Sequence, residues 1–530
     1  MSQQNANQSE FNTIRIVILG ISGALGGLAC GYGGGIVAGA NLYMHEIFPE
    51  MTIYDKQRFV SFAIITATIS AFFSGKLMEK FGRYKTIILS DIFFILGNYT
   101  IAFASEIYHL YIGRLLIGVG LGLGMTVMTV YVAECSPNKL RGTLLSCCIM
   151  LVFMGMTLSY TMAVASNFNH QVLFCFIAIP AGFQILILAF LQGESPVYLV
   201  MKGRNEEAHA HIKRYYKINE QRGLQESEKH YEQIRSQTKT SEQSQSQIEC
   251  YKELFSKYRW NLFMGVFLLI MQQMCGISLI NYYGPKMLKD AGFPQSSRES
   301  LMISMIFLMA FNVIGNLSCT VLSKKYGRRK MILFAAPILF GALSVLTGIV
   351  IVSTQIGHFE INKWLSVLTL AVYLLFFSFG MASQPFTISA EIFPNHLRGV
   401  ANSITGMSSW IGNYILAGVF LQLTSTDAGK IFTYSLLAFN CLIMYAFVWR
   451  FVPETKDRSA NENAELVLKC YSQRYNPEKD LYNRNSDTQI QKPDSVSETK
   501  ERLLENQQNQ KYEIHPDDIE LHDQKHQTAK

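Results

Sequence analysis

The chain has 530 residues, of which 49% are hydrophobic and only 16% are charged. A soluble domain carries about 25% charged residues, because its whole surface faces water. The composition therefore excludes a soluble enzyme, a disulfide scaffold and a disordered chain. The net charge of +7 arises from Lys and Arg scattered among loops, so we expect no nucleic-acid partner.

Apolar stretches of roughly twenty residues or more recur along the chain, which is the length needed to cross about 30 Å of hydrocarbon. We predict an all-α membrane protein with twelve transmembrane helices in two six-helix halves. The first six spans are expected near 14–40, 58–78, 84–105, 108–134, 142–165 and 170–192. The second six are expected near 259–289, 297–323, 329–354, 363–391, 397–424 and 428–452.

The pattern divides the chain into segments 1–13, 14–192, 193–258, 259–452 and 453–530. Segment 193–258 is charged and rich in Gln and Ser, so we expect it neither to span the membrane nor to form a core. The tail from 453 is expected to be largely disordered. Lys and Arg gather in the loops on one side of the spans, so the positive-inside rule places both termini and segment 193–258 in the cytosol.

The N-terminus and the cysteines set further expectations. The first dozen residues lack the basic start and the cleavage site of a secretory signal, so the first span is expected to remain as an anchor. All ten cysteines fall in spans, at their inner ends or in predicted cytosolic segments, so we expect no structural disulfide. No CxxC spacing occurs, and we expect no metal or other cofactor.

The two halves repeat each other in three motifs. EKFGRYK at 79–85 recurs as KKYGRRK at 324–330, and ECSPNKLRG at 134–142 recurs as EIFPNHLRG at 391–399. GESP at 193–196 and VPET at 452–455 each close the sixth span of a half. A parallel duplication of six spans is typical of major facilitator transporters, whose substrate site lies between the halves at mid-membrane.

Further motifs give a resemblance over about residues 31–462. They include GYGGGIVAGA, GRLLIGVGLG, ESPVYL, QQMCGISLINYYG and PETKDR, in this order along the chain. In this order the sequence resembles the sugar-porter branch of the major facilitator superfamily, which includes the facilitative hexose transporters. The resemblance implies a transporter of hexose sugars that works by alternating access, and no enzyme activity.

Acidic and basic residues of the repeated motifs form a predicted inner-face charge network. The set contains Glu79, Arg83, Glu134, Arg141 and Glu194 in the first half, and Arg328, Arg329, Glu391, Arg398 and Glu454 in the second. The resemblance implies that this network locks the outward-facing state by closing the cytosolic side. The alternative is that these residues only fix topology. Tyr84 and Lys324 depart from the family pattern, where a basic and an acidic residue are usual.

Polar side chains inside spans are costly in a membrane, so each is a candidate for function. The resemblance places Gln272, Gln273, Asn312, Phe377 and Asn413 at hexose-binding positions. Ser278 and Phe386 stand where the family has Asn and Trp, Ile149 stands where it has Gln, and the indole of Trp410 suits an apolar sugar face. The alternative for each polar residue is an interhelical hydrogen bond. A hexose is therefore expected, with another polyol or small solute as the alternative.

The mode of coupling depends on Gly33 and Arg114. Proton-coupled sugar porters have an Asp directly after the GY of the first span, close to the Arg of the fourth, whereas this chain has Gly33. Without a titratable group at this place, we predict facilitative uniport. The alternative is proton symport through another acid such as Asp91, whose other interpretation is a structural partner near the membrane boundary.

Other properties are open in the sequence. A non-transporting sugar receptor with the tail as its output is a competing function. The expected partners are a small-molecule sugar and the lipid bilayer, and the two halves together are expected to work as a monomer. The plasma membrane is the expected location, with a vacuolar or vesicular membrane as the alternative.

Overall fold

The computed structural model describes residues 11–137, 140–217, 221–242, 247–290, 298–355, 360–394, 397–456, 458 and 460–472. These residues belong to one compact unit, Met1–Tyr475. Most of the predicted tail lies outside the described residues. The described residues are helical apart from short connections and one isolated bridge between Phe11 and Tyr216.

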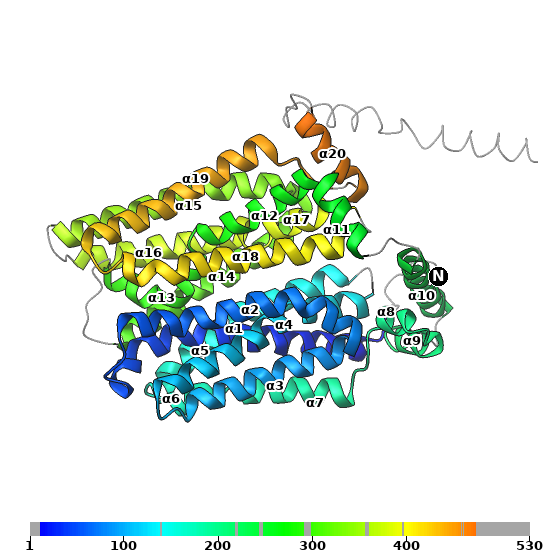
Figure 1. Cartoon of the computed structure of the whole chain (residues 1–530), viewed down its shortest axis with the longest axis horizontal. Helices are drawn as coiled ribbons and strands as arrows, with labels where there is room; N and C mark the ends of the chain where they lie inside the picture. The colour runs from blue at the N-terminus through cyan, green and yellow to red at the C-terminus, as the bar shows by residue number, and fades with distance from the viewer. Residues whose placement is uncertain are drawn as a thin grey trace, which may run out of the picture. The chain divides into compact units, whose positions relative to one another are not determined.

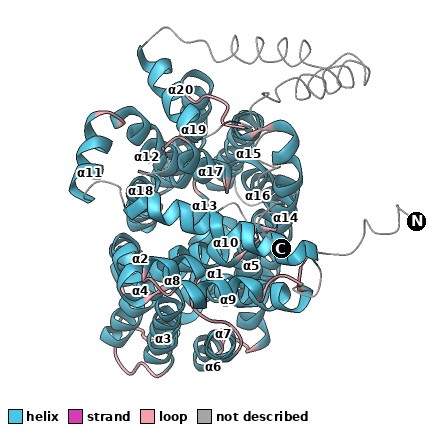
Figure 2. Ribbon diagram, turned by 90° about the vertical axis from the view of Figure 1, so that its right-hand side faces the viewer, coloured by secondary structure: helices cyan, strands magenta, loops and turns pink. Residues whose placement is uncertain are grey.

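Two groups of long helices make up the bundle, and both are seen end-on in Figure 2. The helices of the first group are α1 (Thr13–Ile47), α2 (Ile53–Phe81), α3 (Arg83–Ala102), α4 (Ile107–Cys135), α5 (Arg141–Ala165), α6 (His170–Cys175) and α7 (Ala178–Phe190). Four further helices follow the first group, namely α8 (Pro196–Met201), α9 (Asn205–Lys213), α10 (Gln221–Glu242) and α11 (Gln247–Ser256).

The second group repeats the arrangement of the first and is coloured green to orange in Figure 1. Its helices are α12 (Arg259–Met274), α13 (Ile277–Asp290), α14 (Arg298–Tyr326), α15 (Arg328–Gln355), α16 (Glu360–Phe376), the π-helix η2 (Phe377–Met381), α17 (Gln384–Glu391), α18 (Arg398–Leu423) and α19 (Asp427–Phe451). Helix α20 (Ala460–Ser472) follows the last span.

Twelve helices or helix pairs among the described residues are long and apolar enough to cross a membrane, and each overlaps a predicted span. The prediction of an all-α protein with twelve spans is therefore confirmed. The first helix is longer than its predicted span and continues to Ile47. It ends there because Phe48 precedes Pro49, and the residue before a proline disfavours the helical conformation.

Two spans of the second half are interrupted. The seventh is broken between α12 and α13 at Gly276, whose φ of +105° suits glycine. The tenth passes from α16 through η2 into α17, and Pro385 lies in the first turn of α17. Such π-helical turns are rare and occur frequently at functional sites. Both interruptions lie beside the predicted site residues.

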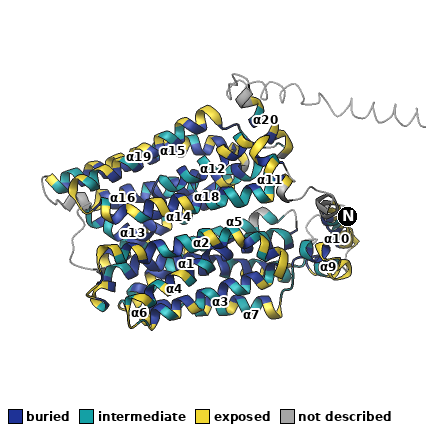
Figure 3. Cartoon of the chain, viewed as in Figure 1, coloured by how far each residue is buried: buried dark blue, intermediate teal, exposed yellow. Residues whose placement is uncertain are grey.

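Apolar side chains face outward from the bundle, as expected of a protein surrounded by lipid. On α7, Ile179, Phe183, Leu186 and Phe190 form an exposed stripe at helical spacing. Figure 3 shows the contrast between the buried residues of the central helices, such as α1 and α4, and the exposed residues along the outer helices. A stripe of this kind would be unfavourable in water and is favourable against acyl chains.

The two halves pack through α2 with α18, α5 with α14 and α1 with α13. Within the first half, α1 and α5 approach so closely that a methyl group on Gly31 would overlap the backbone carbonyl of Val152. The reverse holds for Gly155, which faces the carbonyl of Leu28. Small residues allow this close contact between membrane helices.

Our expectation that segment 193–258 forms no core was wrong. Helices α8, α9 and α10 pack on one another, and α8 also contacts α4. Leu199, Ile212, Tyr216 and Ile234 are buried in a cluster with the ends of α1, α3 and α4. Apolar residues at helical spacing supply this cluster within an otherwise polar segment. We call the end of the bundle that carries α8–α11 the linker end.

Candidate functional site

The predicted charge network lies at the linker end and is built twice. In the first half, Nη2 of Arg83 lies 2.9 Å from Oε1 of Glu134. In the second half, Nη2 of Arg328 lies 2.9 Å from Oε1 of Glu391. Each arginine begins the third span of its half and each glutamate ends the fourth, so the ion pair joins the two spans within one half.

The glutamates after the sixth spans have a different role from the predicted ion pairing. Oε1 of Glu194 accepts hydrogen bonds from the backbone N–H groups of Arg83 at 2.8 Å, Tyr84 at 3.2 Å and Ser195 at 2.9 Å. The first two are at the N-terminus of α3, where the helix has unpaired N–H groups and a partial positive charge. Glu194 therefore caps α3 from a distant segment of the chain.

Glu454 repeats this cap in the second half. Its Oε1 accepts from the N–H of Arg328 at 3.0 Å and of Lys456 at 3.2 Å. The glycines before the two arginines, Gly82 and Gly327, have φ of +92° and +85°. A methyl group on either glycine would overlap the capping carboxylate, so glycine permits both the backbone conformation and the close approach.

Hydroxyl groups complete each cluster, and the sequence analysis missed them. The Ser195 hydroxyl donates to Oε2 of Glu134, and the Thr455 hydroxyl donates to Oε2 of Glu391 at 2.5 Å. A signal for them was present in the sequence, because a hydroxyl residue follows the glutamate in both GESP and VPET. Alignment of these two motifs would have identified the pair.

The remaining members of the predicted network are placed less centrally. Glu79 is exposed, whereas Arg329 is buried and donates to the carbonyl of Trp449 at 2.8 Å. Arg141 and Arg398 are half-buried at the starts of α5 and α18. Among the described residues, each of the two arginine–glutamate ion pairs lies within a single half. An ion pair between the halves at the linker end is still a prediction.

The seventh and tenth spans are joined through Gln272, which is 3% exposed. Its Nε2 donates to the carbonyls of Met381 at 2.9 Å and Ala382 at 2.7 Å. Pro385 has no N–H group, so the carbonyl of Met381 lacks the donor that a continuous helix would supply. Gln272 satisfies this carbonyl, and its own Oε1 is buried without a partner among the described residues.

Gln273 is held by two serines. The hydroxyl of Ser278 donates to its Oε1 at 2.6 Å, and its Nε2 donates to the hydroxyl of Ser409 on α18 at 3.0 Å. The structure thus gives Ser278, one of the departures from the family pattern, a specific contact. Ser409 was not predicted, although it lies one helical turn before Asn413.

The predicted asparagines are also close to other polar groups. Asn312 is fully buried on α14, and its Oδ1 accepts from the hydroxyl of Ser378 in η2. Asn413 on α18 donates through Nδ2 to the hydroxyl of Tyr282 at 3.3 Å, and its Oδ1 is buried without a partner among the described residues. The predicted residues of spans 7, 8, 10 and 11 are thus connected by short hydrogen-bonded links.

The predicted aromatic residues differ in exposure. Phe377 is buried in η2 and stacks on Tyr373 with ring centroids 5.7 Å apart. Phe386 on α17 is 44% exposed, and Trp410 on α18 is half-buried against the core. Ile149, at the place where the family has a Gln, is half-buried on α5. The hydrogen bonds described for the predicted binding residues therefore all lie within the second half.

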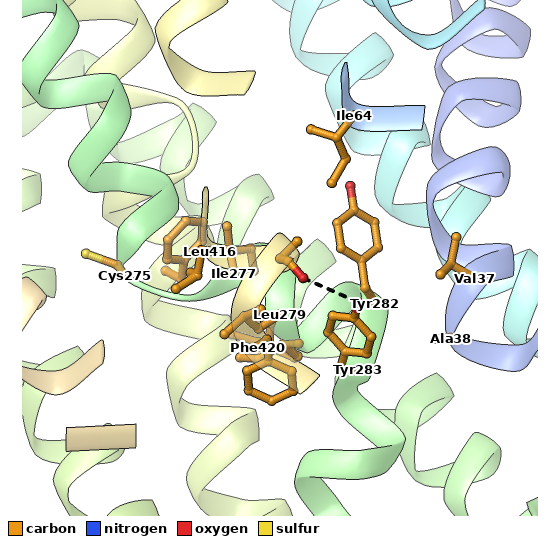
Figure 4. Packing of buried hydrophobic residues seen from close by; sticks show 14 of the residues in the cluster. Val37, Ala38, Ile64, Cys275, Ile277, Leu279, Tyr282, Tyr283, Leu416 and Phe420 are labelled. Atoms are coloured by element: carbon orange, nitrogen blue, oxygen red, sulfur yellow. Dashed lines mark hydrogen bonds between the residues drawn. The ribbon is translucent and has the colours of Figure 1, made fainter. Parts of the chain in front are cut away.

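The broken seventh span also contacts the first half, away from the linker end. The hydroxyl of Tyr160 on α5 donates to the carbonyl of Asn281 at 3.1 Å, and Nδ2 of Asn41 on α1 donates to the carbonyl of Tyr282 at 3.5 Å. Figure 4 shows Tyr282 of α13 between the halves, with its ring directed toward Ile64 of α2. Tyr160 and Asn41 were not predicted, and neither lies in a repeated motif.

The coupling region contains few polar groups. A methyl group on Gly33 would lie 3.2 Å from the ring of Phe94 and 3.9 Å from Ile117, one turn after Arg114 on α4. Arg114 is 1% exposed, and its Nε donates to the carbonyl of Phe59 at 2.7 Å. Asp91 is also 1% exposed, and its Oδ2 has no hydrogen-bond partner among the described residues.

Comparison with known proteins gives consistent matches over most of the chain. The family described as "Sugar (and other) transporter" matches residues 19–466. Sugar transporter ERD6-like 1 of Arabidopsis thaliana is 31% identical over 78% of this chain and 85% of that protein. Probable inositol transporter 2 of the same plant is 28% identical, over 85% of this chain and 91% of that protein. The D-xylose transporter of Levilactobacillus brevis is 30% identical, over 84% of this chain and 94% of that protein.

Solved structures show the same fold. The proton:xylose symporter XylE of the major facilitator superfamily, bound to 6-bromo-6-deoxy-D-glucose, matches with a TM-score of 0.68 at 21% identity. The match covers 86% of this chain and 99% of that one. Family match, relatives and twelve-helix fold agree, so the chain belongs to the sugar porter family of the major facilitator superfamily and is a multi-pass membrane transporter, not an enzyme.

Proposed function

We propose that this sugar transporter carries a hexose or a close polyol analogue such as an inositol. The observation that carries the proposal is the set of amides on spans 7, 8 and 11, which hydrogen bonds link to one another and to span 10. An amide offers both donor and acceptor groups, which suits a ligand covered with hydroxyls. The proposed binding residues are Gln272, Gln273, Ser278, Asn312, Phe377, Phe386, Trp410 and Asn413.

The identity of the sugar is tested by competition. Cells that lack their own carriers would express the protein, and uptake of radiolabelled D-glucose, D-xylose and myo-inositol would be measured against a panel of unlabelled hexoses, pentoses and polyols. We expect competition by at least one hexose or inositol. Efficient competition only by solutes without several hydroxyl groups would contradict the proposal. Deletion from Ser459 onward tests the receptor alternative, because a receptor would show no uptake in either form.

The proposed transport cycle uses the two ends of the bundle in turn. The contacts of Tyr160 and Asn41 with α13 support a state in which the halves are joined away from the linker end. The charged clusters at the linker end would join the halves in the opposite state. If these residues only fixed the topology, no such contact between the halves would be needed. We place the linker end in the cytosol by the positive-inside rule, with the plasma membrane as location and a monomer as the working unit.

For coupling, we propose facilitative uniport. The support is the apolar surrounding of Gly33, where a methyl group would meet Phe94 and Ile117, and the absence of a carboxylate partner for Arg114 among the described residues. Proton symport is the second candidate, because Asp91 is a buried carboxyl group with an unpartnered oxygen. A carboxyl group in such a place can exchange a proton during transport.

Proteoliposomes distinguish the two modes. We expect the protein to equilibrate its sugar across the membrane with the same endpoint whether or not a proton gradient is imposed. The variant Asp91→Asn serves as the control, and in uniport it should equilibrate sugar to that same endpoint. Accumulation against a concentration gradient, abolished in Asp91→Asn, would refute uniport and establish Asp91 as the proton site.

A further inference from the structure

The buried arginine of the fourth span has no carboxylate partner among the described residues. We propose that Arg114 and the hydroxyl of Tyr282 form a binding site for a monovalent anion, which is either a free halide or the carboxylate of an acidic sugar. The inference rests on the proposed function only for its position beside the sugar site. It adds a charged class of ligand that the amide set does not require.

The guanidinium group of Arg114 contacts only neutral groups of the part of the chain that the structure describes. Its Nε donates to the carbonyl of Phe59 at 2.7 Å, and its Cζ lies 5.1 Å from the centroid of the Phe59 ring. Its Nη1 is buried and has no hydrogen-bond partner there. The groups that interact with it electrostatically are the hydroxyls of Tyr282 and Tyr283, and Asp91 is not among them. A full positive charge thus remains in the span with a donor group unused.

A buried charge of this kind is unfavourable unless an opposite charge compensates it. Arg83 shows the usual arrangement, because it is also buried and its Nη2 lies 2.9 Å from Oε1 of Glu134. Arg114 is 1% exposed and lies in a membrane-spanning helix, where an ionised side chain marks a functional site. A halide or carboxylate from outside the chain would supply the missing negative charge. It would also accept from Nη1 in a charge-assisted hydrogen bond, which is stronger than a neutral one.

Tyr282 places this charge next to the proposed sugar site. Its hydroxyl accepts from Nδ2 of Asn413 at 3.3 Å, and its own O–H has no acceptor among the described residues. In Figure 4 its ring is directed from α13 toward Ile64 of α2, the helix that also carries Phe59. Arg114 of the first half and Asn413 of the second half therefore both act on this hydroxyl. An anion held by Arg114 and Tyr282 would contact both halves.

Thermal unfolding of the detergent-solubilised full chain tests for the site. Potassium chloride, D-glucuronate or D-galacturonate would replace the potassium salt of MES, a bulky sulfonate without hydroxyl groups. The ionic strength is held constant so that general screening does not change. We expect at least one of the three anions to raise the apparent Tm by about 5–10 °C at a concentration about a hundred times its Kd. Equal Tm values in all the salts would overturn the inference.

The neutral sugars D-glucose and D-galactose separate the two sources of the anion. A halide site gives stabilisation by chloride, and each acidic sugar then adds no more than its neutral parent. A carboxylate carried by the sugar gives greater stabilisation by the acidic sugar than by its parent, and the acidic sugar should compete for uptake about tenfold better. If chloride has no effect and each acidic sugar stabilises only as much as its parent, the inference is overturned.

Two arginine variants assign the effect to the site. Arg114→Gln removes the charge and should reduce the rise in Tm to within about 1 °C of zero. Arg58→Gln is the matched control, because Arg58 directly precedes Phe59 but is exposed and lies 3.2 Å from Asp55. This variant should keep the full rise. A rise that persists in Arg114→Gln, or that is lost in Arg58→Gln, would overturn the assignment.

Anomalous diffraction from bromide, a small mimic of either anion, keeps the test decisive if Arg114→Gln folds poorly. In crystals of the unmodified protein grown in bromide, we expect a peak within hydrogen-bond distance of Nη1 of Arg114, and bromide bound only elsewhere would overturn the inference. If an anion acts through Arg114 while no sugar competes for uptake, the proposed function fails and this inference stands. If sugars compete and no anion acts through Arg114, only this inference fails.

Discussion

Removal of the carboxylate of Glu194 should destabilise the first half of the protein by a predictable amount. Its Oε1 accepts from three backbone N–H groups, two of which, on Arg83 and Tyr84, are unpaired ends of α3. Replacement of a side-chain helix cap by Ala costs about 0.5–2 kcal/mol, and the loss of a negative charge at a helix N-terminus adds about 0.3–1 kcal/mol. We therefore expect Glu194→Ala to cost about 2 kcal/mol.

The assay is thermal unfolding of the detergent-solubilised protein. The fraction that remains folded after heating is measured by size-exclusion chromatography with fluorescence detection. A cost of 1 kcal/mol lowers the Tm by about 2–4 °C for a unit of roughly 150–250 residues, the size range of the first half, so Glu194→Ala should lower the apparent Tm by about 4–8 °C. Glu194→Gln retains the acceptor oxygen without the charge and should lose about half as much. Glu454→Ala removes the cap of a single helical N–H group, that of Arg328, and should also lose less.

A double variant tests whether Gly82 is needed because of the carboxylate. Gly82→Ala places a methyl group against the carboxylate of Glu194 and also strains a φ of +92°, which costs about 1–3 kcal/mol. Because Glu194→Ala removes the overlap, the double variant should be less unstable than the sum of the single variants. An Ala variant at 194 that melts within about 1 °C of the unmodified protein, or a Gln variant as unstable as the Ala variant, would refute the capping role.

Three further predictions concern the halves, the packing and the linker. Tyr160→Phe removes a hydrogen bond of about 1 kcal/mol between the halves and should increase cysteine-probe labelling at the end away from the linker about fivefold. Tyr32→Phe loses a hydrogen bond within the first half and should leave the labelling unchanged. Equal labelling of the two variants would contradict the proposed contact between the halves. Gly31→Ala should prevent surface expression by separating α1 from α5, whereas Gly75→Ala, with open space around it, should express normally. Normal expression of both variants would refute the close packing of α1 against α5. Burial and nearby Arg141 lower the pKa of His230 from 6.5 to about 4, so the docking of α10 is stable above pH 6.5 and loses up to about 3 kcal/mol as the pH falls to 4. The protection factors of the α10 amides, which are exchange rates corrected for the intrinsic rate at each pH, should fall over this range and should stay nearly constant in His230→Gln. Constant protection factors in the unmodified protein would contradict the prediction.

The sequence by itself determined the number of spans, the duplication and the family. These properties depend on the length of apolar stretches and on motifs that are read along the chain, so they need no knowledge of contacts. The residues of the amide set were also named from the sequence, because polar side chains in apolar spans are conspicuous. The sequence did not reveal that segment 193–258 packs as helices. Its composition is polar overall, and the small number of apolar residues in it is enough to form a buried cluster with the ends of α1, α3 and α4.

Only the tertiary structure decided what each of these groups contacts. Glu194 caps a helix that begins more than a hundred residues earlier, and Gln272 reaches a carbonyl, that of Met381, which lacks its helical donor because of a proline more than a hundred residues later. Tyr160 and Asn41 contribute through bonds to backbone carbonyls of α13, which no side-chain motif encodes. Contacts of this kind depend on the distance and direction between atoms of remote segments. The chain pattern can therefore name the polar residues, but the fold determines which of their atoms remain free to bind a substrate.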